Sequence, residues 1–301
     1  MQDINVPRVE VASDDIKQYS SDDQYMDLLV ELTKEAASLL TVVACLTRGG
    51  SPTDIQPWPR NKAILCGLLV RTCKLLTGFM DSVCAGKFEF VAIHSRLIFE
   101  TCVNLRFLIA EDSAETYESF VRYSLSLEAR LSKRIHRNID ARGYTLPVEE
   151  RMLASIQHSF SSSGVSLQEV GGKQKSWGNG LDQRARKVGL GDPYLLMFSL
   201  PSHAIHGNWE DLLRRHLKEK DGGFLPDPSW YPPRPQVFAG PLVVCLETGR
   251  VYLRHMFGDD TARLEKELFD LEERFRVVTS LHEAFVETRA NEEHSEVEID
   301  C

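Results

Sequence analysis

The residues best suited to chemistry fall in two short stretches, and the first lies in the run F-V-A-I-H-S-R-L-I-F-E. Arg96 and Glu100 are four positions apart there, so on a helix they share one face and can pair. Their neighbours are apolar, and a charge on an apolar helix is costly to bury unless it is paired. The pair is either a functional carboxylate held by an arginine or an ion pair that only ties two helices together.

The second stretch reads S-L-P-S-H-A-I-H-G-N-W. Ser202 and His206 are four positions apart, and His203 and His206 are three apart, so each pair occupies neighbouring positions on one helix face. Two histidines so placed can bind a metal when further ligands complete the set, and Glu100 is a candidate from another helix. The alternative is a histidine stabilised at a helix C-terminus, with Gly207 as the cap.

These residues predict a polar site between two central helices. One helix carries Arg96 and Glu100, and the other carries Ser202 and His206. In such a site His206 would be a general acid or base or a ligand contact, Glu100 would orient it, and Arg96 would hold an anionic group. The pattern is compatible with binding and with catalysis alike.

Other common chemistries lack their motifs. The sequence contains no G-x-S-x-G, no G-x-x-x-x-G-K-[ST] and no G-x-G-x-x-G, so neither a serine-hydrolase elbow nor a standard nucleotide cradle is indicated. The seven cysteines include no C-x-x-C pair, and they are expected to pack as small apolar residues in a reducing compartment. No cofactor is expected, and the pattern leaves a metal open.

Charge is distributed unevenly along the chain, whose formal net charge is −9. Residues 1–35 and 259–301 are strongly acidic, which leaves the middle of the chain net basic. Basic residues are dense in 122–151 and in 173–187, and the second stretch contains Trp177. Cations mixed with an aromatic ring suit RNA as a partner, whereas the alternative is a set of solvated helix faces.

Helical spacing of apolar residues runs through most of the chain. No segment shows period-two alternation with turn signals, so the predicted fold class is all-α, a single multi-helix, bundle-like domain with a long C-terminal helix. A flexible acidic arm, 1–20, is expected before the helical domain, 21–289, and an acidic tail, 290–301, after it. Helices are expected at 21–47, 60–85, 88–110, 114–139, 147–160, 181–188, 193–205, 237–256 and 261–289.

The last of these helices, 261–289, has apolar residues that alternate steps of four and three, the spacing of a packed seam. This seam supports the alternative to an enzyme, a helical interaction or scaffold protein that forms a homodimer through the C-terminal helix. The seam residues are Leu264, Leu268, Leu271, Phe275 and Val278, with His282 next.

The expected location is the cytoplasm, without a membrane partner. The N-terminus is acidic, unlike the basic start of a signal peptide. The most apolar stretch, 63–80, is interrupted by Arg71 and Lys74 before it reaches the roughly 20 residues of a membrane span.

The motifs taken together resemble a bacterial family of unknown function built on one helical domain. Its members share R-x-x-x-E, then W-x-x-x-x-x-x-R-A, then a tyrosine followed by S-x-x-x-H-G. The matching segments are Arg96–Glu100, Trp177–Ala185 and Tyr194–Gly207. The resemblance covers residues 60–258 and implies an all-helical fold with no established activity.

The same pattern is distantly similar to HEPN-type helical domains, several of which are RNases. Those enzymes use an arginine and a histidine on one helix to cleave RNA through its 2′-hydroxyl. In this chain Ser202 or another uncharged residue stands where the arginine should precede His206. A nuclease of this type would therefore take its arginine from elsewhere, and Arg96 is the candidate.

Overall fold

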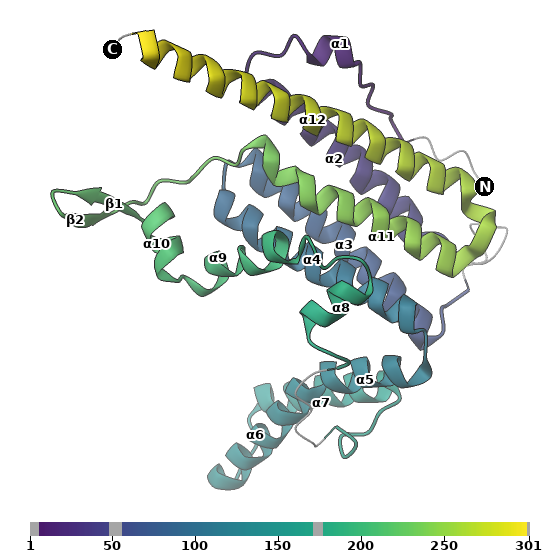
Figure 1. The fold of residues 1–301 in the computed structure, drawn as a ribbon. Helices are drawn as coiled ribbons and strands as arrows, with labels where there is room; N and C mark the ends of the chain where they lie inside the picture. The colour runs from purple at the N-terminus through teal and green to yellow at the C-terminus, as the bar shows by residue number, and fades with distance from the viewer. Residues whose placement is uncertain (1–5, 48–55, 171–176, 300–301) are drawn as a thin grey trace.

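Helices make up almost all of the regular structure in the computed structural model, which describes residues 6–47, 56–170 and 177–299, with side chains up to residue 291 (Figure 1). The all-α prediction is confirmed. The elements are α1 (Ser13–Ile16), α2 (Asp22–Ala44), α3 (Arg60–Cys84), α4 (Phe88–Glu111), α5 (Ala114–Ser124), α6 (Ser126–Arg142), α7 (Pro147–Ser163), α8 (Leu181–Lys187), the π-helix η1 (Leu195–Ser199), α9 (Ser202–His206), α10 (Trp209–Arg215), β1 (Leu217–Lys220), β2 (Gly223–Pro226), the 3₁₀ turn η2 (Pro235–Phe238), α11 (Ala239–Phe257), the 3₁₀ turn η3 (Gly258–Thr261) and α12 (Ala262–Ile299).

The central bundle is formed by α2, α3, α4, α11 and α12, with α4 packed between α3 and α11 (Figure 1). The apolar residues of α4 lie in the core, and Phe99, Cys102 and Leu105 are fully buried. A further side of α4 contacts α8, η1 and α9. Because the core takes the apolar sides of α4, its polar residues are left to meet the segment that runs from α8 to α9.

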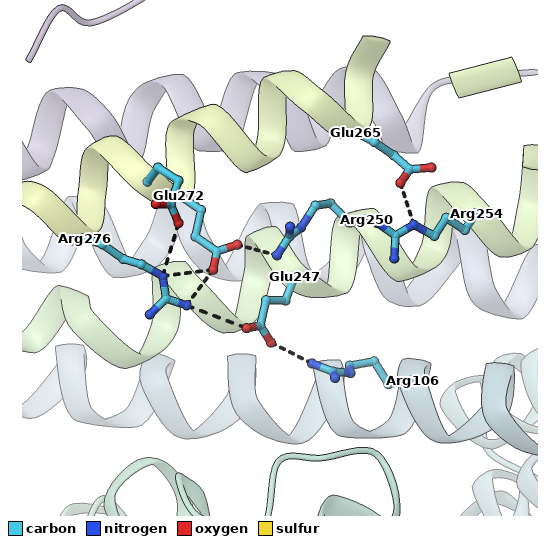
Figure 2. A network of polar contacts seen from close by, with 8 residues as sticks. Arg106, Glu247, Arg250, Arg254, Glu265, Glu272 and Arg276 are labelled. Atoms are coloured by element: carbon cyan, nitrogen blue, oxygen red, sulfur yellow. Dashed lines mark hydrogen bonds and ion pairs between the residues drawn. The ribbon is translucent and has the colours of Figure 1, made fainter. Parts of the chain in front are cut away.

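A network of charged side chains joins α4, α11 and α12 (Figure 2). Glu272 of α12 is buried and bonds both Arg250 of α11, at 2.5 Å, and Arg276. Glu247 of α11 receives Arg106 of α4 at 3.1 Å, and Arg106 also donates to the backbone carbonyl of Val188, at the end of α8. The network therefore fixes α8 against α4.

Helices α5, α6 and α7 lie at one end of the bundle and bury a small apolar cluster of their own (Figure 1). The single helix expected at 114–139 is two helices, because the chain turns at Leu125. Leu125 and the α6 residue Ala129 are both buried in this cluster, together with Phe160 of α7. The turn lets α5 and α6 each direct an apolar side to the same cluster.

The acidic arm is anchored where the structure describes it, from residue 6, rather than loose as predicted. Ile16 of α1 is buried, 2% exposed. The backbone amide of Val9 donates to Glu35 of α2 at 2.8 Å, and Arg274 of α12 donates to the Val9 carbonyl. Arg274 and Glu35 also form a bidentate ion pair that is almost completely buried. Contacts between residues far apart in the chain hold the arm, which local sequence patterns do not predict.

The seam of α12 faces its own chain, so the prediction that it forms a homodimer interface is wrong for these residues. The seam residues are between 0% and 9% exposed, and α12 packs on α2 and α11. Close approach is possible because Gly249 of α11 lacks a Cβ, which would lie 2.6 Å from Leu40 of α2. The helix continues to Ile299, beyond the expected end at 289, and extends past α11 (Figure 1).

The helix expected at 193–205 is broken into η1 and α9, because Pro201 cannot donate the backbone hydrogen bond that a continuous helix needs. After α10 the chain forms an antiparallel hairpin that pairs Leu217 with Pro226, so the expectation of no strands is wrong here. Asp221 and Gly222 both have positive φ in its two-residue turn. An Asp-Gly turn is a known hairpin signal, and it was the available sequence cue.

Among the described residues, α3 alone is long and apolar enough to qualify as a membrane span by length and composition. Its face with Leu69, Leu76 and Phe79 is fully buried, and it packs between α2 and α4. Arg71, on the same helix, donates to Thr101 of α4 at 3.2 Å. One face of α3 therefore packs inside the bundle, while 33% of its most apolar window is buried.

Candidate functional site

A polar stripe on α4 faces the segment from Trp177 to His206. Arg96, Glu100 and Asn104 follow each other at intervals of four residues, so they lie on one side of the helix. The opposing segment supplies aromatic rings and one buried arginine, Arg184. The stripe and this segment form the candidate site.

The guanidinium of Arg96 lies on the ring of Phe198, with 4.3 Å from its central carbon to the ring centre. The ring of Tyr194 stacks on the ring of Phe198, with 5.1 Å between the two ring centres, and it also packs edge-on against Phe99 of α4. The Nη1 atom of Arg96 is buried and has no hydrogen-bond partner in the described part of the chain. Arg96 is thus held by an aromatic ring and retains unused donors.

The predicted pair between Arg96 and Glu100 does not form. The carboxylate of Glu100 is half-buried and has no hydrogen bond or ion pair with any of the described residues. Its charge nevertheless acts on two neighbours across the site, Arg184 and Tyr194. Two opposite charges one helical turn apart therefore remain available to a third group.

Arg184 of α8 closes one side of the site and is 7% exposed. Its Nη1 donates to Asn104 at 2.9 Å, and its guanidinium lies 4.1 Å above the ring of Trp177. The Nε atom is buried and lacks a partner among the described residues. Burial lowers the pKa of Arg184, and the nearby Glu100 carboxylate acts in the opposite direction.

Tyr194 contributes a hydroxyl that stays protonated at neutral pH. Burial raises its pKa, the carboxylates of Asp182 and Glu100 raise it further, and Arg96 opposes them. A neutral phenol is both a donor and an acceptor. Tyr194 can therefore donate a hydrogen bond to an anion held by Arg96.

Ser202 and His206 lie on α9, which contacts α4, but neither bonds Glu100 in the described structure. The Ser202 hydroxyl donates to the Phe198 carbonyl at 2.6 Å, a bond within its own segment. His206 is exposed, and Gly207 follows it with a φ of 54° as the helix cap. The expected contact between Glu100 and His206 is therefore absent, because α9 ends with the histidine pointing to solvent.

The structure gives no support to a metal at this site. His203 bonds Asn208, and the described residues contain no group of three or more His, Cys, Asp or Glu side chains that could hold an ion. The residues that surround Arg96 and Glu100 instead are Asn104, Trp177, Arg184, Tyr194 and Phe198. Trp177, Arg184 and Tyr194 belong to the shared motifs, and Asn104 continues the four-residue spacing of the stripe.

These features define a helical domain whose central helix carries a polar stripe in which Arg96 and Glu100 do not pair with each other, while Asn104 accepts a bond from Arg184. The chain belongs to the family of unknown function DUF5677, whose model matches residues 62–224. That match runs from α3 to the hairpin and includes every residue of the candidate site. No curated protein and no solved structure matches the chain.

Proposed function

We propose that the α4 stripe and the segment Trp177–His206 bind a phosphate-bearing ligand, RNA or a nucleotide-like anion, in the cytoplasm. The observation that carries this proposal is the half-buried Arg96, which keeps a buried donor unsatisfied although Glu100 lies one turn away. A buried polar group without a partner costs about 1–3 kcal/mol. Because Nη1 itself is enclosed by protein atoms, a ligand oxygen would bond the other N–H donors of the half-buried guanidinium.

RNA is favoured among anions by the rest of the surface. The aromatic rings of Tyr194 and Phe198 adjoin Arg96, as stacking rings adjoin cations in single-strand binders. Helix α6, which packs on α5 and α7 at one end of the bundle, carries further exposed cations, Lys133, Arg134 and Arg137. Arg96 would bind a phosphate, and Tyr194 would donate to it.

The chemistry that such a site could add is cleavage of the bound strand. By the HEPN-type resemblance, the exposed His206 would take the proton of the 2′-hydroxyl as that oxygen attacks phosphorus, and Arg96 would stabilise the phosphate. The bond from phosphorus to the 5′-oxygen would break, and that oxygen would take up a proton and leave. Incubation of the full chain with an RNA and with the DNA of the same sequence separates an enzyme from a binder. Cleavage of the RNA alone, lost in His206→Ala, makes the protein an enzyme.

Changing Arg96→Gln is expected to weaken binding of a short fluorescein-labelled single-stranded RNA by at least about tenfold, the loss of one charge-assisted bond to phosphate. The measurement is fluorescence anisotropy at fixed salt, because affinity for RNA falls with ionic strength. Lys266→Gln is the control, since it removes the same charge from an exposed position on α12. Equal affinities for the two variants would contradict the proposal.

A second candidate, a non-enzymatic interaction protein, is favoured by exposed leucines beside the site. Leu195, Leu196 and Leu200 are 61%, 66% and 51% exposed, and clustered exposed apolar side chains mark protein contact surfaces. A second copy of the chain could dock on this surface, in place of the buried α12 seam. Sedimentation velocity across a concentration series is expected to detect dimers that Leu196→Ser abolishes and Val277→Ser retains. A monomer at every concentration rules this candidate out.

A further inference from the structure

A cavity separate from the candidate site lies where the start of α4, the end of α10 and the segment before η2 meet. Its volume is about 500 Å³, within the range of small-molecule pockets. Three arginines, Arg214, Arg215 and Arg234, line it together with the rings of Phe88 and Tyr231. It shares no residue with the Arg96 site.

Arg215 is the fixed cation of this pocket. Its Nη1 donates at 2.6 Å to Asp211, whose side chain is only 3% exposed. Its guanidinium also lies 4.7 Å from the ring centre of Phe88. A carboxylate on one side and a ring on another hold the guanidinium plane, so it is preorganised for a ligand.

The pocket has an excess of positive charge. Arg214 is paired with Glu210 and Arg215 with Asp211. Arg234 is exposed, and its guanidinium forms no hydrogen bond or ion pair within the described residues. One full positive charge therefore remains uncompensated among these five residues, and it attracts an anion.

The start of α4 forms one wall of this pocket, and its first turn also carries the buried carboxylate of Glu89. The helix begins at Phe88, and the residue before it makes no side-chain capping bond. The Phe88 amide donates to the carbonyl of Tyr231 at 3.0 Å, which ties the two aromatic walls together. The amides of Phe90 and Val91 donate to the carbonyl of Lys87, so the positive charge of the pocket comes from its arginines.

The arginines favour an anionic group on the ligand, and the apolar walls of the pocket favour a flat apolar ring. Phe88 and Tyr231 are flat, and Pro232 and Val237 complete an apolar lining. We propose that this pocket binds a small aromatic anion, a flat ring that carries a phosphate or a carboxylate. The ring packs against Phe88 and Tyr231, and the anionic group bonds Arg215 and Arg234.

The test is isothermal titration of the full chain with phenyl phosphate, with benzoate, and with inorganic phosphate and phenol as separate halves of the ligand. Phenyl phosphate or benzoate is expected to bind with a dissociation constant of about 1 mM or tighter, and to bind more tightly than either half. The preferred head group distinguishes a phosphate ligand from a carboxylate ligand. No saturable binding of either aromatic anion overturns the proposal.

Two variants localise the binding. Arg234→Gln is expected to weaken it about fivefold, as one partly exposed charge-assisted hydrogen bond does, and Phe88→Leu is expected to remove the advantage of the ring over inorganic phosphate. Arg151→Gln, an exposed arginine of α7, is the matched control and leaves binding unchanged. Circular dichroism checks that each variant is folded. Unchanged affinity in a folded Arg234→Gln protein also overturns the assignment.

Discussion

Replacing Glu35 by alanine is expected to lower the free energy of unfolding by about 3–5 kcal/mol, the cost of leaving one partner of a buried ion pair alone. The side chains of Glu35 and Arg274 are 5% and 12% exposed, and they bond at 2.5 and 2.8 Å. Glu35 also accepts the amide of Val9. The substitution therefore removes three hydrogen bonds and leaves the buried guanidinium of Arg274 without its carboxylate. The contact that joins α2, α12 and the N-terminal arm is lost.

Urea unfolding followed by circular dichroism measures this effect, because the midpoint shifts in proportion to the free energy at constant slope. Glu31→Ala is the matched control, since Glu31 lies on the same helix and pairs with Lys34 at the surface. Exposed pairs contribute little to stability. Equal shifts in the two variants would show that the pair between α2 and α12 does not hold the bundle.

Truncating Leu271 to alanine is expected to cost about 2–5 kcal/mol, the range for a large apolar side chain removed from a packed core. Leu271 is 0% exposed and lies in the interface that α12 forms with α2 and α11. Because its contacts are made within one chain, the loss appears in the unfolding free energy. The mass of the folded protein in solution does not change.

Light scattering of the folded variant therefore accompanies the unfolding curve. Val277→Ala serves as the control, because Val277 lies on the same helix and is 38% exposed. Its substitution is expected to fall within about 0.5 kcal/mol of the wild type. If Leu271→Ala changes the mass of the folded protein in solution but barely lowers its free energy of unfolding, the seam is a dimer interface and this prediction is wrong.

The candidate site shows where the polar pattern of α4 was informative. The spacing of Arg96 and Glu100 placed both on one helix face, and that face does meet the segment that carries Tyr194 and Ser202. Spacing permits a pair but does not enforce one, because each side chain also responds to what lies opposite. Arg96 found the ring of Phe198, and Glu100 stayed without a partner among the described residues.

The burial of Arg184 could not be predicted from local pattern alone. Arg184 belongs to a basic run that suggested a solvated face, yet it is enclosed by Trp177 and Asn104. Asn104 is far from Arg184 in the chain, so the bond between them exists only once α8 has packed on α4. The charged network through Arg106 secures that packing.

By itself, the sequence determined the all-α class, the positions of most helices and the apolar face of α12, because these depend on periodicity, prolines and glycines within one or two turns. Only the tertiary structure decided what each face meets. The seam spacing of α12 is compatible with packing on a second chain and with packing on α2 and α11, and in the structure α12 packs on α2 and α11. Likewise Arg96 and Arg184 owe their unsatisfied donors to the elements packed over them, since burial and hydrogen-bond partners are set by contacts between distant segments.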